Sequence, residues 1–295
     1  MHLFLNGRFV PRDEARVSVF DAGLQHAVGL FETLGARNGQ VFRPRFHVDR
    51  LIESARTLGL SESLHAGPLV DALQATLERN ALAEARLRLT VTGGDLNLLQ
   101  STGEGGHDPT VLIVAQPPTR YPEAFFEKGV MVTIADARTN PLDPFAGHKA
   151  LSYWNRIRPL QHAGRAGGSE ALWFSVTNHL ASGCVSNAFL VKDGILLTPF
   201  ARGEEMSGAL PAPVLPGITR GVILELAQER RLPVERRQLS VEDVLGADEV
   251  FLTNSSWGVL PVVAVEKEPI GKGAVGEVAK AMREGWLRVV EEETA

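Results

Sequence analysis

Two Asn-Gly pairs near the N-terminus constrain the fold most strongly, because each lies between two short apolar segments. Asn6-Gly7 lies within residues 3–10, and Asn38-Gly39 lies within residues 30–43. Both central positions of a tight hairpin turn need a positive φ, which Asn and Gly tolerate best. The N-terminal part is therefore expected to contain antiparallel β-hairpins.

Helical periodicity follows the second hairpin. Pro44 opens a segment whose apolar residues recur at helical spacing, and a second helix is expected after Pro68. Residues 86–92 and 110–115 are expected to form strands. The glycine-rich segment between them, residues 93–106, is expected to be a mobile loop.

The proline-rich segment at residues 116–122 marks a domain boundary, because proline removes backbone donors and restricts the residue before it. We expect a smaller N-terminal α+β domain over residues 1–118 and an interdomain linker over residues 119–129. A larger C-terminal domain of mixed strands and helices is expected over residues 130–295.

Strands and helices alternate irregularly in the C-terminal part. Strands are expected at residues 130–135, 170–176, 189–191, 195–197 and 249–253. Helices are expected at residues 151–160, after Thr219 and at residues 276–290, and Ser240 with Asp243 has the spacing of a capping box. Strands outnumber those of a simple βαβ alternation, which favours the α+β class over a doubly wound sheet.

Composition excludes several classes of partner. The net charge of −5 gives no positive surface for a polyanion, so no nucleic-acid partner is expected. The single cysteine, Cys184, excludes an internal disulfide and fits a reducing compartment. The start of the chain lacks the pattern of a signal peptide, and no apolar run approaches membrane-spanning length. We expect a cytoplasmic protein with no membrane partner.

Motifs of other enzyme classes are not found. The sequence has no GxxxxGK[ST] loop and no GxSxG elbow, so neither a P-loop nor a hydrolase serine is supported. Its histidines show no HxxxH spacing and its cysteine no CxxC partner. No metal site is therefore expected.

Six short segments occur in order across nearly the whole chain and together form a recognisable pattern. They are residues 21–34, residues 47–55, Lys149 with the Leu-Ser-Tyr-Trp-Asn run that follows, residues 186–194, residues 215–220 and residues 247–262. This ordered set resembles the fold-type IV pyridoxal-phosphate enzymes. That family includes branched-chain and D-amino-acid aminotransferases and aminodeoxychorismate lyases.

The resemblance implies a two-domain fold of the D-amino-acid aminotransferase type, with pyridoxal 5'-phosphate as cofactor and Lys149 as the lysine that forms the Schiff base. A lysine in this role must also move protons as a neutral base, which burial and a nearby cation favour by lowering its pKa. The resemblance further implies a homodimer. The leading prediction is an aminotransferase that moves an amino group between an amino acid or amine and a 2-oxo acid.

The resemblance also implies the groups that bind the cofactor's phosphate, a dianion that needs a cation and convergent N–H donors. Arg50 resembles the phosphate-binding arginine, and Gly217, Ile218 and Thr219 resemble the helix N-terminus that faces the phosphate. Asn254 and Ser255 match a second phosphate loop. The alternative interpretations are a solvated helix arginine and an ordinary N-cap threonine.

The sequence departs from the family where the cofactor's pyridine nitrogen is bound. The family usually has a glutamate five residues before the position of Asn187, and here that position is Ser182. A hydroxyl can only hydrogen-bond a largely neutral ring, so weaker stabilisation of a carbanion is expected. We hypothesise that Ser182 still faces the pyridine nitrogen. His26, Phe31 and Tyr153 are candidates for the substrate side, and a histidine satisfied between strands is the alternative for His26.

Two further functions stay open. The first is 4-amino-4-deoxychorismate lyase, which eliminates pyruvate to give 4-aminobenzoate. Residues 253–261 resemble lyases, whereas Thr92-Gly93-Gly94-Asp95 replaces an arginine-containing segment that lyases often carry. The second is a non-catalytic relative that binds the cofactor or a partner protein, and the serine at position 182 is its support.

Overall fold

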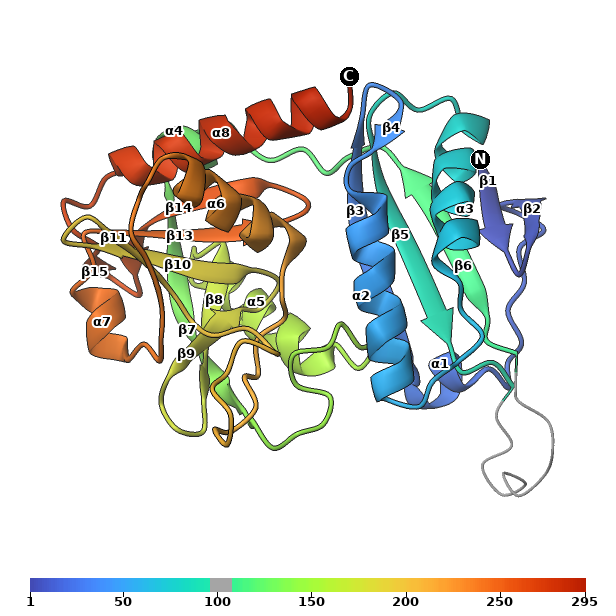
Figure 1. Cartoon of the computed structure of the whole chain (residues 1–295), viewed down its shortest axis with the longest axis horizontal. Coiled ribbons are helices and arrows are strands. Elements are labelled where there is room, and N and C mark those ends of the chain that lie inside the picture. The colour runs from blue at the N-terminus through green and yellow to red at the C-terminus, as the bar shows by residue number, and fades with distance from the viewer. Residues whose placement is uncertain (96–107) are drawn as a thin grey trace. The chain divides into compact units, whose positions relative to one another are not determined.

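The structure is a computed structural model that describes residues 1–95 and 108–295 (Figure 1). Most of the predicted loop at residues 93–106 lies outside the described residues. The chain divides into two compact units. Unit 1 comprises Met1–Thr119, His148–Ser152 and Val290–Ala295, and unit 2 comprises Arg120–Gly147 and Tyr153–Val289.

Unit 1 is built on a six-stranded antiparallel sheet with the strand order β2-β1-β6-β5-β3-β4. The strands are β1 (His2–Leu5), β2 (Arg8–Pro11), β3 (Gly29–Arg37), β4 (Gln40–Val41), β5 (Ala85–Thr92) and β6 (Val111–Gln116). Asn6 and Gly7 have φ values of 47° and 81°, and Asn38 and Gly39 have φ values of 52° and 75°. Both predicted hairpins are therefore confirmed, with the left-handed turn conformation that these residues favour.

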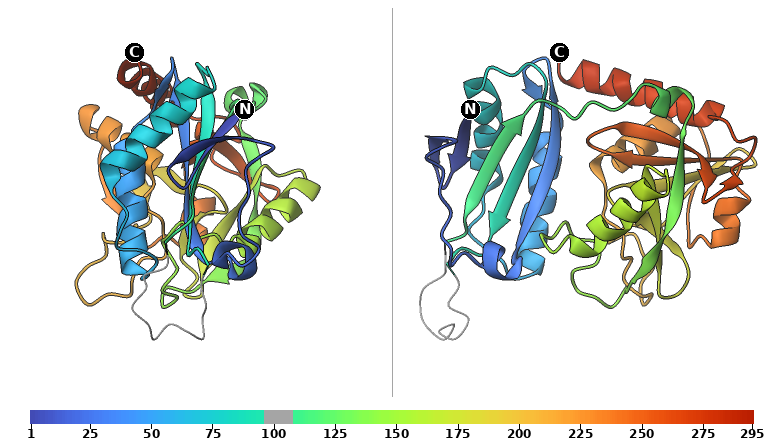
Figure 2. Two further views of the ribbon diagram at one scale, coloured as in Figure 1. Left: turned by 90° about the vertical axis from the view of Figure 1, so that its right-hand side faces the viewer. Right: turned by 180° about the vertical axis from the view of Figure 1, so that it is seen from behind.

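Helices cover one face of this sheet. The helices of unit 1 are α1 (Ala22–His26), α2 (Pro44–Thr57) and α3 (Ala66–Arg79), and Figure 2 shows α2 and α3 on the same side of the strands. Their apolar residues, such as Leu51 and Leu73, pack with Leu34 and Leu87 of the sheet in one core. Both predicted helices are confirmed, because their periodic apolar residues face this core.

Unit 2 holds a nine-stranded mixed sheet with the order β12-β11-β10-β13-β14-β7-β8-β9, and β15 pairs with β14. Its strands are β7 (Val130–Thr139), β8 (Glu170–Ser175), β9 (Leu180–Gly183), β10 (Asn187–Lys192), β11 (Ile195–Thr198), β12 (Val234–Arg236), β13 (Glu249–Asn254), β14 (Gly258–Val265) and β15 (Glu268–Pro269). Its helices are α4 (Ala124–Glu127), α5 (Trp154–Arg165), α6 (Ile218–Glu229), α7 (Val241–Leu245) and α8 (Glu277–Glu293), of which α8 ends in unit 1. Antiparallel strand pairs and helices outside a βαβ repeat confirm the predicted α+β class.

Four strands of unit 2, β9, β12, β14 and β15, were not expected from the sequence, and two of them show why. β9 is the short run Leu-Ala-Ser-Gly, and β14 carries Pro261 opposite Phe251 of β13. Proline and glycine both weaken a strand pattern. Pairing with the neighbouring strands determines that both segments are extended, and every residue of β9 is buried in the sheet.

The segment around Lys149 departs from the predicted helix and from the predicted domain range. The helix expected from residue 151 begins at Trp154, because the residues before it hydrogen-bond to β3. The Phe31 N–H donates to the Lys149 carbonyl over 3.0 Å, and the Leu151 N–H donates to the Gly29 carbonyl over 2.9 Å. These bonds place His148–Ser152 in unit 1, although the range 130–295 put them in the C-terminal domain.

The C-terminal residues also belong to unit 1. Arg43, which precedes α2, donates from Nη2 to Glu293 Oε1 over 2.6 Å and from Nε to Glu293 Oε2 over 2.9 Å.

Within the described ranges, no helix is both long enough and apolar enough to cross a membrane.

Candidate active site

Lys149 lies against an aromatic ring in unit 1. Its Nζ is 4.6 Å from the centroid of the Phe31 ring, and the Arg88 guanidinium of β5 lies over the same ring at 3.8 Å. Its neighbour His148 is anchored to α2, with His148 Nδ1 2.8 Å from Ser54 Oγ. The structure thus brings the predicted Lys149 and Phe31 together and adds a second cation, Arg88.

Arg50 is part of a buried charge cluster on α2 and β3. Its Nε and Nη2 donate to Glu32 Oε1 and Oε2 over 2.9 Å and 2.6 Å. His47 Nδ1 lies 2.7 Å from Glu32 Oε2. Glu32 and His47 are each 1% exposed and Arg50 is 8% exposed, so the alternative of a solvated helix arginine is wrong.

Opposite charges decide the ionisation of this cluster. Burial by itself raises the pKa of Glu32. The effects of Arg50 and His47 outweigh burial and lower the pKa from 4.5 to about 2. Burial lowers the pKa of His47, and the hydrogen bond that Glu32 accepts from His47 opposes this by raising it. At neutral pH the cluster therefore holds an ionised Glu32, a charged Arg50 and a neutral His47, and the two-pronged ion pair fixes the orientation of the guanidinium.

Sequence reasoning missed Glu32, His47 and Arg88 as site residues. A signal was present for Glu32, because it lies two residues from both Leu30 and Leu34 on β3. Side chains two residues apart on a strand point to the same face, which here faces the core. A charged residue at a core-facing strand position needs a buried partner.

The first turn of α6 in unit 2 carries the predicted phosphate residues. Gly217 is the N-cap, and no side chain caps this N-terminus. The Asn187 Nδ2 donates to the Leu215 carbonyl over 2.8 Å, and a Cβ built on Gly217 would collide with Asn187 Oδ1. Main-chain N–H groups of Ile218 and Thr219 thus stand at a helix N-terminus, where the helix dipole favours an anion.

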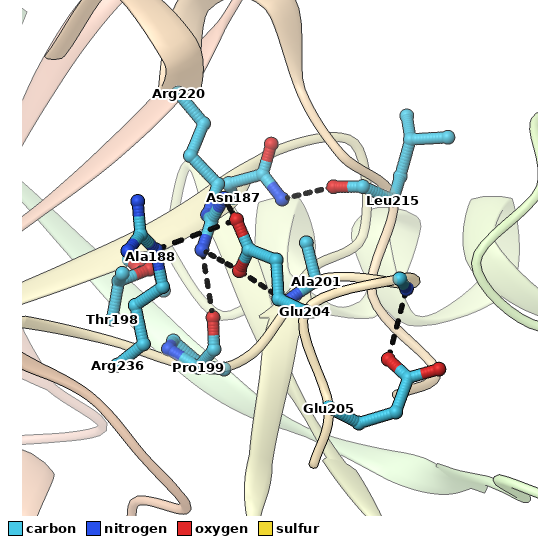
Figure 3. A network of polar contacts seen from close by, with 11 residues as sticks. Asn187, Ala188, Thr198, Pro199, Ala201, Glu204, Glu205, Leu215, Arg220 and Arg236 are labelled. Atoms are coloured by element: carbon cyan, nitrogen blue, oxygen red, sulfur yellow. Dashed lines mark hydrogen bonds and ion pairs between the residues drawn. The ribbon is translucent and has the colours of Figure 1, made fainter. Parts of the chain in front are cut away.

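An ion pair between a buried arginine and a half-buried glutamate fixes the loop that leads to this turn (Figure 3). Arg220 donates from Nη1 and Nη2 to the two Glu204 oxygens over 2.8 Å and 2.6 Å, and from Nη2 to the Pro199 carbonyl over 3.1 Å. The Ala201 N–H donates to Glu204 Oε2 over 2.9 Å. Since Arg220 is 3% exposed, the start of α6 is held tightly against residues 199–204.

Asn254 shapes the turn between β13 and β14. Its Oδ1 accepts from the N–H groups of Ser256 and Trp257 over 2.9 Å and 3.0 Å, and its Nδ2 donates to the Val185 carbonyl over 3.2 Å. These bonds present Ser255, which is half-buried, inside the turn. Asn254 thus orders the turn through its side chain, and Ser255 is the residue of this pair that can offer a hydroxyl.

Ser182 is buried at the end of β9 and lies next to an arginine. Its Oγ donates to the Gly183 carbonyl over 2.8 Å and lies 3.4 Å from Arg156 Nη1 of α5. The Tyr153 hydroxyl donates to the nearby Cys184 carbonyl over 3.4 Å. Sequence reasoning missed Arg156, because nothing in the helical pattern of α5 distinguishes it from its neighbours.

A buried carboxylate holds the turn behind Ser182. Glu170 Oε1 accepts from the Cys184 N–H over 3.1 Å, and Oε2 accepts from the Val185 N–H and the Ser186 hydroxyl over 3.1 Å each. Burial raises the pKa of Glu170 against these hydrogen bonds. Burial and the adjacent Glu170 also raise the pKa of Cys184 to about 12, so its thiol stays neutral.

The predicted cofactor residues of unit 2 therefore meet at connected turns. The bond from Asn254 to Val185 links the β13–β14 turn to the turn after Ser182, and Asn187 links that turn to the start of α6. Among the residues predicted in unit 1, His26 lies apart from the contacts of Lys149, since it is exposed at the last position of α1.

Comparisons with known proteins identify the family of this chain. A family model described as Amino-transferase class IV matches residues 29–265. A Methanocaldococcus jannaschii protein described as "Putative branched-chain-amino-acid aminotransferase" is 33% identical over 285 residues, which cover 96% of this chain and 94% of that protein.

Solved structures are similar over nearly the whole chain. The T.th. branched-chain amino acid aminotransferase with pyridoxamine 5'-phosphate has a TM-score of 0.88 and 26% identity, covering 99% of this chain and 94% of that one. The 4-amino-4-deoxychorismate lyase from Pseudomonas aeruginosa has a TM-score of 0.81 and 30% identity, covering 96% and 97%. The predictions of family, fold, aminotransferase function and pyridoxal-phosphate cofactor are confirmed at the level of the family. This chain belongs to the class IV aminotransferases.

Proposed function

We propose that this chain transfers an amino group between an amino acid or amine and a 2-oxo acid, with pyridoxal 5'-phosphate bound as a Schiff base on Lys149. The observation that carries the proposal is the environment of Lys149. Its backbone is fixed to β3 by a hydrogen bond from Phe31, its Nζ lies on the Phe31 ring, and the Arg88 cation shares that ring. These contacts hold the Lys149 side chain in a defined environment, and its neutral amine is the form that reacts with an aldehyde.

The residues of this chain fit the phosphate of the cofactor. The N-terminus of α6 offers main-chain donors at Ile218 and Thr219 with no side-chain cap in the way. A phosphate dianion is the ligand that such a helix end favours. Arg50 is held in one orientation by Glu32 and supplies the cation, and Ser255 supplies a hydroxyl.

The remaining groups suit substrates that carry a carboxylate. Arg88 and Lys149 both lie against the Phe31 ring, and a guanidinium binds carboxylates through paired hydrogen bonds. Phe31 offers an apolar ring, and Tyr153 stays a candidate on the substrate side. When bound, the cofactor supplies the electron-withdrawing ring system, and Lys149 removes and returns the proton at the substrate α-carbon.

The test is covalent attachment followed by a donor and acceptor screen. The purified protein is incubated with pyridoxal 5'-phosphate, reduced with borohydride and digested, and the modified peptide is identified by mass spectrometry. We expect cofactor on Lys149 in the wild type and none in Lys149→Ala. Lys192→Ala is the matched control, because Lys192 pairs with Asp248 at the surface. Absence of attachment in the wild type contradicts the proposal and favours a non-catalytic relative.

The second candidate is 4-amino-4-deoxychorismate lyase. It is supported by the similarity to the Pseudomonas aeruginosa lyase structure and by the lyase-like pattern at residues 253–261. Incubation with 4-amino-4-deoxychorismate separates the two functions, because only a lyase releases pyruvate and 4-aminobenzoate. L- and D-amino acids with 2-oxo acids are tested in parallel, and amino transfer without 4-aminobenzoate supports the aminotransferase.

We also propose that the protein is a homodimer and acts in the cytoplasm. The family resemblance supports the homodimer, and the single buried Cys184 fits a reducing compartment. Light scattering of the eluted protein measures the mass of the particle. A mass near twice 31.9 kDa supports the dimer, and the mass of one chain contradicts it.

A further inference from the structure

We propose that Ser182 and Arg156 together hold the pyridine nitrogen of the cofactor without a proton. This inference rests on the proposed function, because it concerns the cofactor that Lys149 would bind. It starts from the position where the sequence has Ser182 in place of the usual glutamate. A glutamate would favour the protonated nitrogen, whereas Ser182 lies within reach of a cation.

Arg156 is fixed beside the Ser182 hydroxyl by several contacts. Its Nη1 lies 3.4 Å from Ser182 Oγ and donates to the carbonyls of Gly183 and Cys184 over 3.3 Å and 3.1 Å. Its guanidinium also lies over the Trp173 ring at 4.9 Å from the centroid. Four separate contacts therefore place a full positive charge at the end of β9.

Within the part of the chain that the structure describes, Arg156 contacts no carboxylate directly. In the ranges 1–95 and 108–295, none of the ion pairs involves Arg156. Glu170 lies behind the same turn, but its two oxygens accept from three residues of the turn and from the Ala171 N–H. Both Glu170 oxygens are thus engaged with the turn, burial raises the pKa of Glu170, and the Cys184 thiol is neutral.

The arrangement determines which form of the nitrogen is stable. A positive charge nearby disfavours a second positive charge on the ring, which lowers the pKa of the pyridine nitrogen. The Ser182 hydroxyl can donate one hydrogen bond, and it now donates this bond to the Gly183 carbonyl. Rotation of the hydroxyl toward the cofactor would direct the same hydrogen bond to the lone pair of the nitrogen. Arg156 therefore acts as a positioning residue through Ser182, and the ring withdraws electrons more weakly than a protonated one.

The test is nitrogen-15 NMR of the holoprotein loaded with pyridoxal 5'-phosphate labelled at the ring nitrogen. We expect the wild-type resonance at the position of an unprotonated pyridine throughout the neutral pH range. Arg156→Gln should shift it toward the protonated position, and Arg156→Lys should keep the wild-type position because the charge remains. Arg158→Gln is the matched control on α5, since Arg158 is exposed and pairs with Asp136.

The outcomes distinguish this inference from the proposed function. A covalently attached cofactor whose nitrogen is protonated in the wild type overturns the inference and leaves the proposed function standing. Wild-type behaviour of Arg156→Gln also overturns the role of Arg156. Failure of the cofactor to attach to Lys149, detected by mass spectrometry of the same sample, overturns both. The wild-type spectrum decides the protonation state even when a variant does not fold.

Discussion

Glu32 and Arg50 form a two-pronged buried ion pair, with N–O distances of 2.9 Å and 2.6 Å. Glu32 follows Phe31 on β3, and successive side chains of a strand point to opposite faces. One face of β3 therefore holds the proposed phosphate-binding arginine, and the other carries the ring on which Lys149 lies. A single strand thus orders two groups of the proposed active site.

Replacement of Glu32 should destabilise unit 1 strongly. Glu32→Gln leaves the buried Arg50 without its anion, and removal of one partner of a buried pair costs about 3–5 kcal/mol. Urea unfolding measures the loss, and cofactor titration should show weaker binding because the guanidinium loses its fixed orientation. Asp49→Asn is the control on the same helix, where the exposed pair with Arg45 contributes at most about 0.5 kcal/mol. Equal effects of the two substitutions would contradict the assignment.

Stability should fall as the pH decreases below neutral. Burial lowers the pKa of His47, so below about 6.5 the unfolded chain takes up a proton that the folded chain does not. The pKa of Glu32 falls from 4.5 to about 2 on folding, so its contribution is present above 4.5 and is lost between pH 4.5 and 2. The contribution of Glu32 to the free energy of unfolding is on the order of 3 kcal/mol. Unfolding measured from pH 7 to 3 should show this loss in the wild type, and a flat profile contradicts it.

Two glycines of the same region should respond in opposite ways to alanine. Gly217→Ala brings a Cβ against Asn187, which should cost about 1–3 kcal/mol of stability and weaken cofactor binding. Gly221→Ala lies in α6 with open space around its Cβ, so it should stabilise the protein by up to about 1 kcal/mol. Thermal unfolding and cofactor titration of both variants check this, and normal binding by Gly217→Ala would argue against the phosphate site.

Removal of the Lys149 amine should abolish the proton transfer as well as the attachment. Lys149→Ala is expected to lose at least about 10²–10⁴-fold in amino-transfer rate, measured by coupled assay with the best donor and acceptor. Lys192→Ala should keep the wild-type rate. A rate for Lys149→Ala within threefold of the wild type would exclude the assigned role.

Arg88 should affect the binding of carboxylate substrates more than the rate at saturation. Arg88→Gln removes the paired donors, and loss of a hydrogen bond to a charged group costs about 1.5–3 kcal/mol, which corresponds to a rise in KM of about 10–100-fold. Arg86→Gln, two residues earlier on β5, is the control. Steady-state kinetics with an amino acid and with an amine lacking the carboxylate separates the effects, because only the amino acid should lose affinity.

The sequence by itself determined the local structure and the family. The Asn-Gly turns, the helix after Pro44 and the capping box at Ser240 and Asp243 follow from backbone preferences within a few residues, and all are present. The ordered segments around Lys149 identified the family, and a family model now matches residues 29–265. Turns, helix starts and helix caps can be predicted from a sequence because they depend on residues that are neighbours along the chain.

Only the tertiary structure decided which distant groups share an environment. Pairing of residues 149–151 with β3 replaced the first turn of a predicted helix, and the fold of unit 1 brought Arg88 onto the ring that Lys149 contacts. Arg156 and Ser182 are 26 positions apart, and no periodicity predicts their contact. Burial keeps His47 neutral, whereas Arg50 keeps Glu32 ionised against the effect of burial. Desolvation and Coulomb interactions depend on distances in space and not on separation along the chain.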